Sequence, residues 1–174
     1  MLAAACGSGG SSAGTIKGQA FSPQEASSGN VSLGGSDTGA AILVANTTGI
    51  CADLAASKQP KNLQALLLIL FDVSASTGAK SAPAAPGTYT VSTGTQAKSA
   101  IVLYSVTDAT CKEITAQGAT GVSGTVTLTS ASNGSYSGTY AVTFDSSDRL
   151  SSSFTAASCS SIDVLFGSGT PTCF

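Results

Sequence analysis

Cysteine is the residue type best suited to chemistry in this 174-residue chain, because histidine is absent. Four of the five cysteines lie in the body of the chain: Cys51, Cys111, Cys159 and Cys173. An even set of this kind indicates two disulfides in a chain that folds in an oxidising compartment. Zinc binding is the alternative, but without a CxxC pair or a histidine it would need four distant thiolates. We therefore predict two disulfides and no metal site.

The pairing of these cysteines stays open, since four cysteines allow three connectivities. Spacing slightly favours Cys159 with Cys173, which would close the C-terminal segment. It then leaves Cys51 with Cys111, which would join two loops.

Catalytic arrangements are limited by the same composition. Without histidine, Ser-His-Asp and Cys-His sites are excluded. Lysine could activate serine in Lys80-Ser81 or Lys98-Ser99, but both pairs are expected in polar loops and no Ser-x-x-Lys motif is present. Asp145 and Asp148 are close in sequence, where they are expected to shape a turn. We predict no catalytic residue, no cofactor and no enzymatic activity; a hydrolase that uses dispersed carboxylates is the alternative.

The fifth cysteine, Cys6, follows three alanines and precedes a Gly/Ser stretch that runs to Gly14. This arrangement resembles the lipid-attachment site of bacterial lipoproteins. Ala3 stands where leucine is usual, and only Met1 and Leu2 precede the small residues, whereas a secretory signal has a basic segment and an apolar segment of about 7 to 15 residues. A stray thiol in an Ala/Gly tail is the alternative. The resemblance implies that Cys6 carries the lipid and that residues 1–14 are a signal remnant and flexible tether.

Charge and hydropathy restrict the possible partners. Charged residues make up 9% of the chain, the net charge is −2, and the seven Lys and Arg residues are scattered. No basic face for nucleic acid is therefore expected. The longest apolar run, residues 65–71, is far shorter than the roughly 20 residues of a membrane-spanning helix. We expect membrane contact through the N-terminal lipid alone.

Short alternating segments separated by Gly, Pro, Asn and Asp predict a single β domain over residues 15–174. One short helix is expected over 50–58. About nine short strands favour an antiparallel two-sheet sandwich, with an eight-stranded barrel as the alternative. The expected strands are 15–21, 39–46, 62–73, 87–92, 100–106, 111–115, 121–129, 136–144, 150–156 and 161–166.

The clearest feature is a hairpin formed by 121–129 and 136–144. Asn133-Gly134 between them suits the positive φ angles of a tight turn. Val126 and Leu128 alternate with threonines, so one face should point inward and a threonine ladder outward. With 150–156 as a third strand, these segments are expected to form an antiparallel meander.

Several stretches together resemble uncharacterised β-rich bacterial lipoproteins: Gly14 to Phe21, Cys51, Pro86 to Val91, Ser123 to Thr129, and Ser153 to Cys159. The resemblance implies an extracytoplasmic, lipid-anchored protein of the bacterial envelope, facing the periplasm or the cell surface. The resemblance transfers no site residues. Because no catalytic arrangement is found, we expect a binding or structural role, with a protein or glycan as the partner.

A barrel that binds a small ligand in its interior is a further alternative. It depends on whether Tyr89, Tyr104, Tyr136 and Tyr140 line an apolar pocket or fill a packed core.

Overall fold

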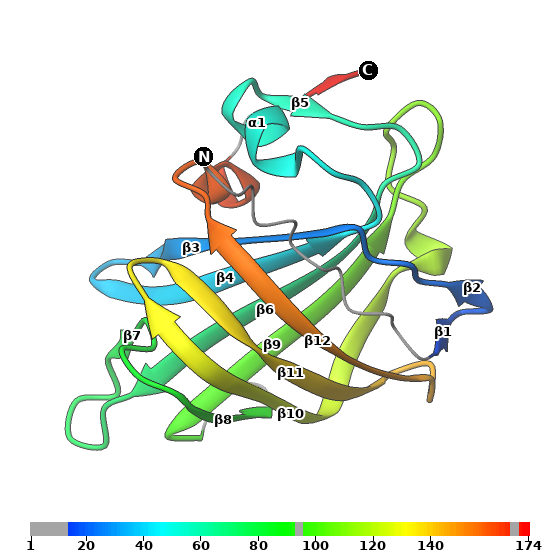
Figure 1. Ribbon diagram of the computed structural model, residues 1–174. Helices are drawn as coiled ribbons and strands as arrows, with labels where there is room; N and C mark the ends of the chain where they lie inside the picture. Colours follow the sequence, from blue (N-terminus) through cyan, green and yellow to red (C-terminus); the bar gives the residue numbers. More distant parts are fainter. Residues whose placement is uncertain (1–13, 93–95, 168–170) are drawn as a thin grey trace, which may run out of the picture.

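The computed structural model describes residues 14–92, 96–167 and 171–174. Its main feature is a nine-stranded sheet in the order β4-β3-β12-β11-β10-β8-β9-β6-β7, in which β4 also pairs with β6. The β4–β6 pairing closes eight of these strands into a barrel (Figure 1), and β7 borders only the end of β6. The strands are β3 (Glu25–Gly34), β4 (Asp37–Ala45), β6 (Gln64–Val73), β7 (Lys80–Ser81), β8 (Gly87–Val91), β9 (Lys98–Val106), β10 (Ala119–Ser132), β11 (Ser135–Phe144) and β12 (Arg149–Ser158).

The predicted all-β class is confirmed, and the architecture is the barrel that the sequence left as the alternative to a sandwich. Closure depends on β3, a Ser/Gly-rich segment that carries no clear strand pattern. β3 pairs antiparallel with β4 and parallel with the end of β12, where Ala157 and Ser158 lie opposite Ser27 and Ser28. The buried Ser28 hydroxyl donates to the Gly134 carbonyl at 2.8 Å, which ties this seam to the tip of the β10–β11 hairpin.

The meander β10–β11–β12 and its tight turn form as predicted. Asn133 and Gly134 have φ angles of 49° and 77°, the conformation that Asn-Gly provides in a two-residue hairpin turn. Val126 and Leu128 point into the barrel, while Thr125 and Thr129 are exposed. The threonine ladder extends to β8, since the Thr88 and Thr127 hydroxyls lie 3.2 Å apart.

The barrel interior is filled by apolar side chains from every wall. Two of them, Ile16 and Phe21, come from a small hairpin of β1 (Thr15–Ile16) and β2 (Gln19–Ala20), where the sequence predicted one strand. Lys17 and Gly18 take positive φ angles and reverse the chain there. The larger interior residues from the strands are Ile42, Val44, Leu66, Leu68, Leu70, Tyr89, Val102, Tyr104, Val126, Leu128, Tyr136, Tyr140, Val142, Phe144, Leu150 and Phe154.

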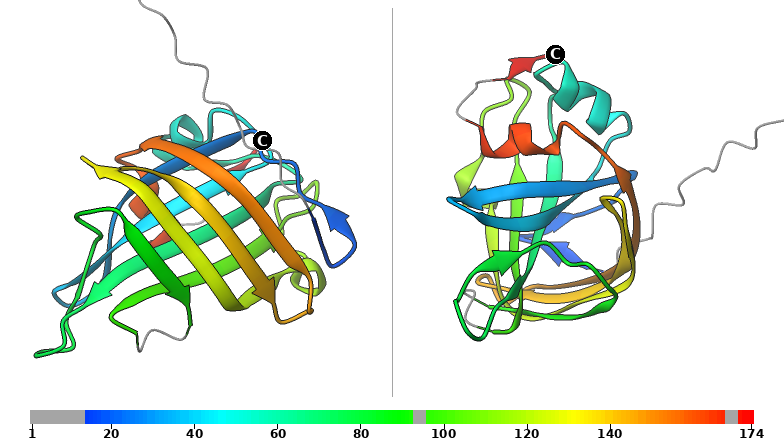
Figure 2. Two further views of the ribbon diagram at one scale, coloured as in Figure 1. Left: turned by 60° about the horizontal axis from the view of Figure 1, so that its bottom comes forward. Right: turned by 90° about the vertical axis from the view of Figure 1, so that its left-hand side faces the viewer.

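A second apolar cluster lies outside the barrel, against β3, β4 and β6. It is covered by α1 (Ile50–Ala55), β5 (Lys58–Gln59), the 3-10 helix η2 (Ile162–Phe166) and β13 (Thr172–Cys173), which together we call the cap (Figure 2). Ile50 and Leu54 of α1 and Ile162 of η2 pack there with Leu43 and Ala65 of the barrel. We call the outward faces of β4, β6 and β9 the capped wall and those of β10, β11 and β12 the bare wall.

Two segments differ from the predicted strands. Residues 161–166 form η2, because Ile162 must fold back onto β3 beside Gly29. Residues 111–115 form a loop with a single bridge between Thr107 and Glu113, followed by the 3-10 helix η1 (Thr115–Gln117). The predicted helix is confirmed as α1, although it is shorter than expected.

Within the described ranges, no helix is long and apolar enough to cross a membrane.

Candidate functional site

The four body cysteines form two disulfides, as predicted, and both hold the cap. Cys51 of α1 pairs with Cys159, which follows β12, and Cys111 pairs with Cys173 of β13; each pair has a Cα–Cα distance of 5.6 Å. These disulfides indicate folding in an oxidising, extracytoplasmic environment. Cys6 lies outside the described residues, as does the tether up to residue 13.

The favoured connectivity is therefore wrong, and the reason is tertiary. Spacing favoured local pairs, but the chain end returns to β5, where Thr172 and Cys173 pair in parallel with Lys58 and Gln59. This places Cys173 beside the loop that holds Cys111. Each disulfide consequently closes a long loop, of 108 and 62 residues in sequence separation.

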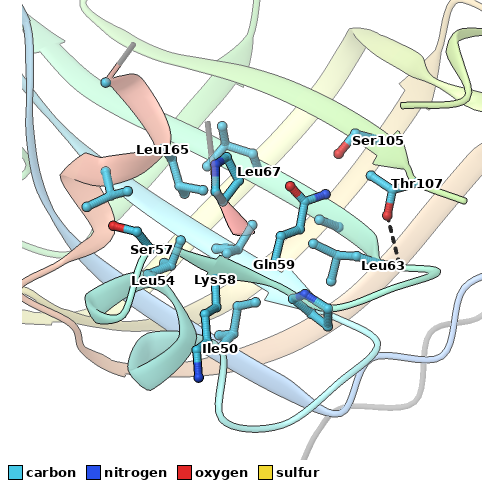
Figure 3. Close-up of a pocket in the computed structure, with 16 residues that line it drawn as sticks. Ile50, Leu54, Ser57, Lys58, Gln59, Leu63, Leu67, Ser105, Thr107 and Leu165 are labelled. Atoms are coloured by element: carbon cyan, nitrogen blue, oxygen red, sulfur yellow. Dashed lines mark hydrogen bonds between the residues drawn. The ribbon is translucent and has the colours of Figure 1, made fainter. Parts of the chain in front are cut away.

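A pocket of about 350 Å³ lies between the cap and the capped wall (Figure 3). The barrel contributes its floor, with Leu43 from β4 and Ala65 and Leu67 from β6. The cap contributes the other side, through α1, β5 and the segment around η2. The remaining apolar lining residues are Ile50, Leu54, Pro60, Leu63, Val164, Leu165 and Pro171. A concave, mostly apolar site with a few polar groups is the usual form of a small-molecule site.

The strands explain why this floor is apolar. β4 and β6 carry nearly continuous apolar runs, because one face points into the barrel and the other toward the cap. Leu66 and Leu68 are thus interior residues, while Ala65 and Leu67 face the pocket. The sequence signal for the pocket was present in the run 65–71, but it also fits a strand that is simply buried on both faces.

Polar groups gather at one end of the pocket, on β9 and β5. The Thr107 hydroxyl accepts a hydrogen bond from the Leu63 backbone N–H at 3.0 Å (Figure 3). Ser105, two residues earlier on the same face of β9, is half-buried. The Gln59 side-chain amide donates to the Cys111 carbonyl at 3.4 Å. None of these residues was singled out from the sequence.

The rim of the pocket exposes large apolar side chains. Val164 and Leu165 line it, and the next residue, Phe166, is 40% exposed. Leu103, on the outward face of β9, is also exposed. Val164, Leu165 and Phe166 thus place three consecutive exposed apolar side chains beside the pocket.

The two lysine–serine pairs that were considered as candidate nucleophiles lie in strands. Lys98 and Ser99 begin β9 and do not lie in a polar loop; Lys80 and Ser81 form β7. The Lys98 ammonium donates to Asp72 at 2.9 Å and to the Tyr89 hydroxyl at 3.3 Å. The hydrogen bond to Asp72 raises the pKa of Lys98, and burial raises the pKa of Tyr89. Both groups therefore remain protonated near neutral pH.

Asp148 serves the turn that it was expected to shape, whereas the Asp145 carboxylate accepts a hydrogen bond from the Thr120 backbone N–H at 3.3 Å. Asp148 accepts hydrogen bonds from the Ser146 hydroxyl at 2.6 Å and from the Lys17 backbone N–H at 2.8 Å. These hydrogen bonds hold the pKa of Asp148 below its usual range, and the bond from Ser146 has the larger effect. Among the described residues, no cluster of three or more His, Cys, Asp or Glu could hold a metal ion.

The four tyrosines belong to the packed barrel interior, and none of them lines the pocket under the cap. Burial raises the pKa of Tyr104 and of Tyr140 to about 12; a weaker opposing effect of Ser152 acts on Tyr140. The hydroxyls of both residues are buried and have no hydrogen-bond partner among the described residues that satisfies ordinary hydrogen-bond geometry. Side chains thus fill this region of the barrel, as in other small barrels.

Comparison with known proteins finds no matching family model, no matching curated protein and no matching solved structure.

Proposed function

We propose that the protein is a lipid-anchored, extracytoplasmic binding protein of a bacterial envelope, and that it binds an apolar ligand in the pocket under the cap. The observation that carries this proposal is the apolar pocket itself, which is lined from both the barrel and the cap. Two disulfides support it, since they attach the pocket's covering elements to the barrel and to its loops. Attachment through Cys6 is supported by the resemblance to lipoprotein attachment sites.

Binding is tested with N-phenyl-1-naphthylamine, an uncharged dye that fluoresces when it enters an apolar site. Ala65→Leu adds volume to the pocket floor, so we expect dye binding to fall at least about tenfold, a loss of about 1.4 kcal/mol in binding free energy. The matched control, Ala141→Leu, adds the same volume to the exposed bare wall and should leave dye binding unchanged.

Thermal unfolding distinguishes a filled pocket from a damaged fold. Overpacking a dense core costs about 1 to 3 kcal/mol, whereas filling empty space should leave the unfolding temperature of Ala65→Leu near that of the wild type. Equal dye binding by wild type and by a folded Ala65→Leu variant would contradict the proposed site.

The anchor is tested separately by expression of the full native gene in a bacterium. We expect a lipid mass addition and membrane association for the wild type, and neither for Cys6→Ala. Identical masses and identical fractionation would overturn the anchor while leaving the pocket proposal intact.

A further inference from the structure

We propose that the pocket selects an uncharged acyl compound, meaning an aliphatic chain whose first polar group is a neutral hydrogen-bond acceptor such as an ester carbonyl. It should discriminate against the corresponding free carboxylate. This inference rests on the binding function proposed above and specifies the ligand class of that same site.

The apolar part of the pocket sets the size of the chain. A cavity of about 150 Å³ lined by similar side chains holds one benzene, which has six carbons. In proportion, about 350 Å³ holds on the order of 14 non-hydrogen atoms. A chain of about 12 carbons with the start of a polar head therefore matches the volume.

The polar end holds two hydroxyl groups whose O–H donors are used by no described residue. Thr107 already uses its hydroxyl oxygen to accept from Leu63, so its O–H proton remains available to a ligand. The Ser105 hydroxyl makes no hydrogen bond to any described residue. Ser105 lies on β9 and Thr107 directly follows the last residue of that strand, and both line the pocket. Two free O–H donors at the end of an apolar chamber fit a carbonyl oxygen.

The charged residues around the pocket favour an ester over a free acid as the polar group of the ligand. Lys58 is the only residue with a charge among the described residues that line the pocket, and its side chain is exposed. Its ammonium lies 5.8 Å from the centre of the Phe174 ring, at the rim. In Figure 3 this ammonium points away from Ser105 and Thr107. A carboxylate at the polar end would be desolvated without a cation beside it, which is unfavourable, while a neutral carbonyl meets no such cost.

The test is displacement of N-phenyl-1-naphthylamine at pH 8 by 1-lauroylglycerol and by laurate, both below their micellar concentrations. These probes share a 12-carbon acyl chain and differ in the charge of the first polar group. We expect 1-lauroylglycerol to displace the dye at concentrations at least about tenfold lower than laurate.

Variants test which side chain of the pocket donates a hydrogen bond to the neutral acceptor of the ligand. Ser105→Ala removes one hydrogen-bond donor. It should weaken the binding of 1-lauroylglycerol several-fold, as expected for one neutral hydrogen bond, and have little effect on dye binding. Ser123→Ala, on an exposed part of β10, is the matched control and should change neither.

Two outcomes would overturn the inference. Laurate that binds as well as the ester and is weakened by Lys58→Met would show an acid with its head at the rim. Dye that is displaced by neither compound, while Ala65→Leu still abolishes dye binding, would reject the acyl class but keep the pocket. Failure of Ala65→Leu to reduce dye binding rejects the pocket itself, so the two proposals fail separately.

Discussion

The capped wall and the bare wall belong to the same barrel, but the outward faces of their strands differ in burial. On the bare wall, β11 and β12 alternate in burial along the strand and β10 does so around Val126, with Val126 or Phe154 inside and exposed small polar side chains such as Thr125 outside. Strands β4 and β6 of the capped wall are apolar on both faces, as with Leu66 inside and Ala65 outside, whereas the outward face of β9 also carries Ser105. The second layer covers the apolar outward faces of β4 and β6, and the candidate site lies between that layer and the barrel.

The two walls also differ in what stabilises them. The bare wall is formed by hairpins between consecutive strands, which are local in sequence. The disulfides of the cap join α1 to Cys159, which follows β12, across 108 residues, and β13 to the loop that holds Cys111 across 62 residues. Local pairing and long-range crosslinks should therefore respond differently to perturbation, and the predictions below use that contrast.

Removing the disulfides should have the largest effect. On the chain-entropy model, loops of 62 and 108 residues give about 4 to 5 kcal/mol of stabilisation each. In Cys51→Ser/Cys159→Ser, hydrogen exchange should show faster exchange in α1 and η2, while β10–β12 stay protected until global unfolding. Equal loss of protection in both walls would show that the cap is not a separate cooperative unit.

Truncation of one outward-facing side chain on each wall should give the next largest difference. Leu43→Ala on the capped wall removes a side chain that is 3% exposed, and it should lower the free energy of unfolding by about 2 to 5 kcal/mol. Thr125→Ala on the bare wall should change it by less than about 0.5 kcal/mol. Urea unfolding of both variants measures this, and similar costs would mean that the bare wall is covered in solution.

The tyrosine hydroxyls inside the barrel offer a finer comparison. Tyr136 donates to the Asn30 side chain at 2.8 Å, whereas the Tyr104 hydroxyl has no hydrogen-bond partner among the described residues. Tyr136→Phe should cost about 1 kcal/mol, while Tyr104→Phe should be neutral or stabilising. A cost for Tyr104→Phe equal to that of Tyr136→Phe would reveal a bound water or ligand at the Tyr104 hydroxyl.

The smallest effect is expected from pH at the turn that precedes β12. The pKa of Asp148 lies below its usual value of 3.8, so its contribution to stability is present above that value and is lost as the pH falls through the folded-state pKa. The difference in unfolding free energy between wild type and Asp148→Asn should therefore shrink between about pH 5 and pH 2. A difference that is constant with pH would show that the hydrogen bonds do not depend on the ionised carboxylate.

Much of the bare wall was predictable because its information is local. The Asn133-Gly134 turn and the alternation around Val126 define β10, β11 and their register without reference to the rest of the chain. β3 was missed for the opposite reason. Its serines and glycines have little strand propensity, and it is held as a strand by β4 on one side and β12 on the other.

The cap could not be derived in the same way. Residues 161–166 read as a strand, but burial of Ile162 against β3 produces a 3-10 helix instead. A Cβ at Gly29 would lie 2.7 Å from the Ile162 side chain, so glycine is what allows this close approach. No local sequence pattern predicts a contact between residues more than 130 positions apart.

By itself, the sequence determined the all-β class, the meander, the short helix and the presence of two disulfides. It did so because turn chemistry, period-two alternation and an even number of cysteines are properties of neighbouring residues or of composition. Only the tertiary structure decided barrel closure, the pairing Cys51–Cys159 and Cys111–Cys173, and the pocket beneath the cap. Those features depend on which distant surfaces meet, and the apolar runs of β4 and β6 fit several partners until the whole chain is packed.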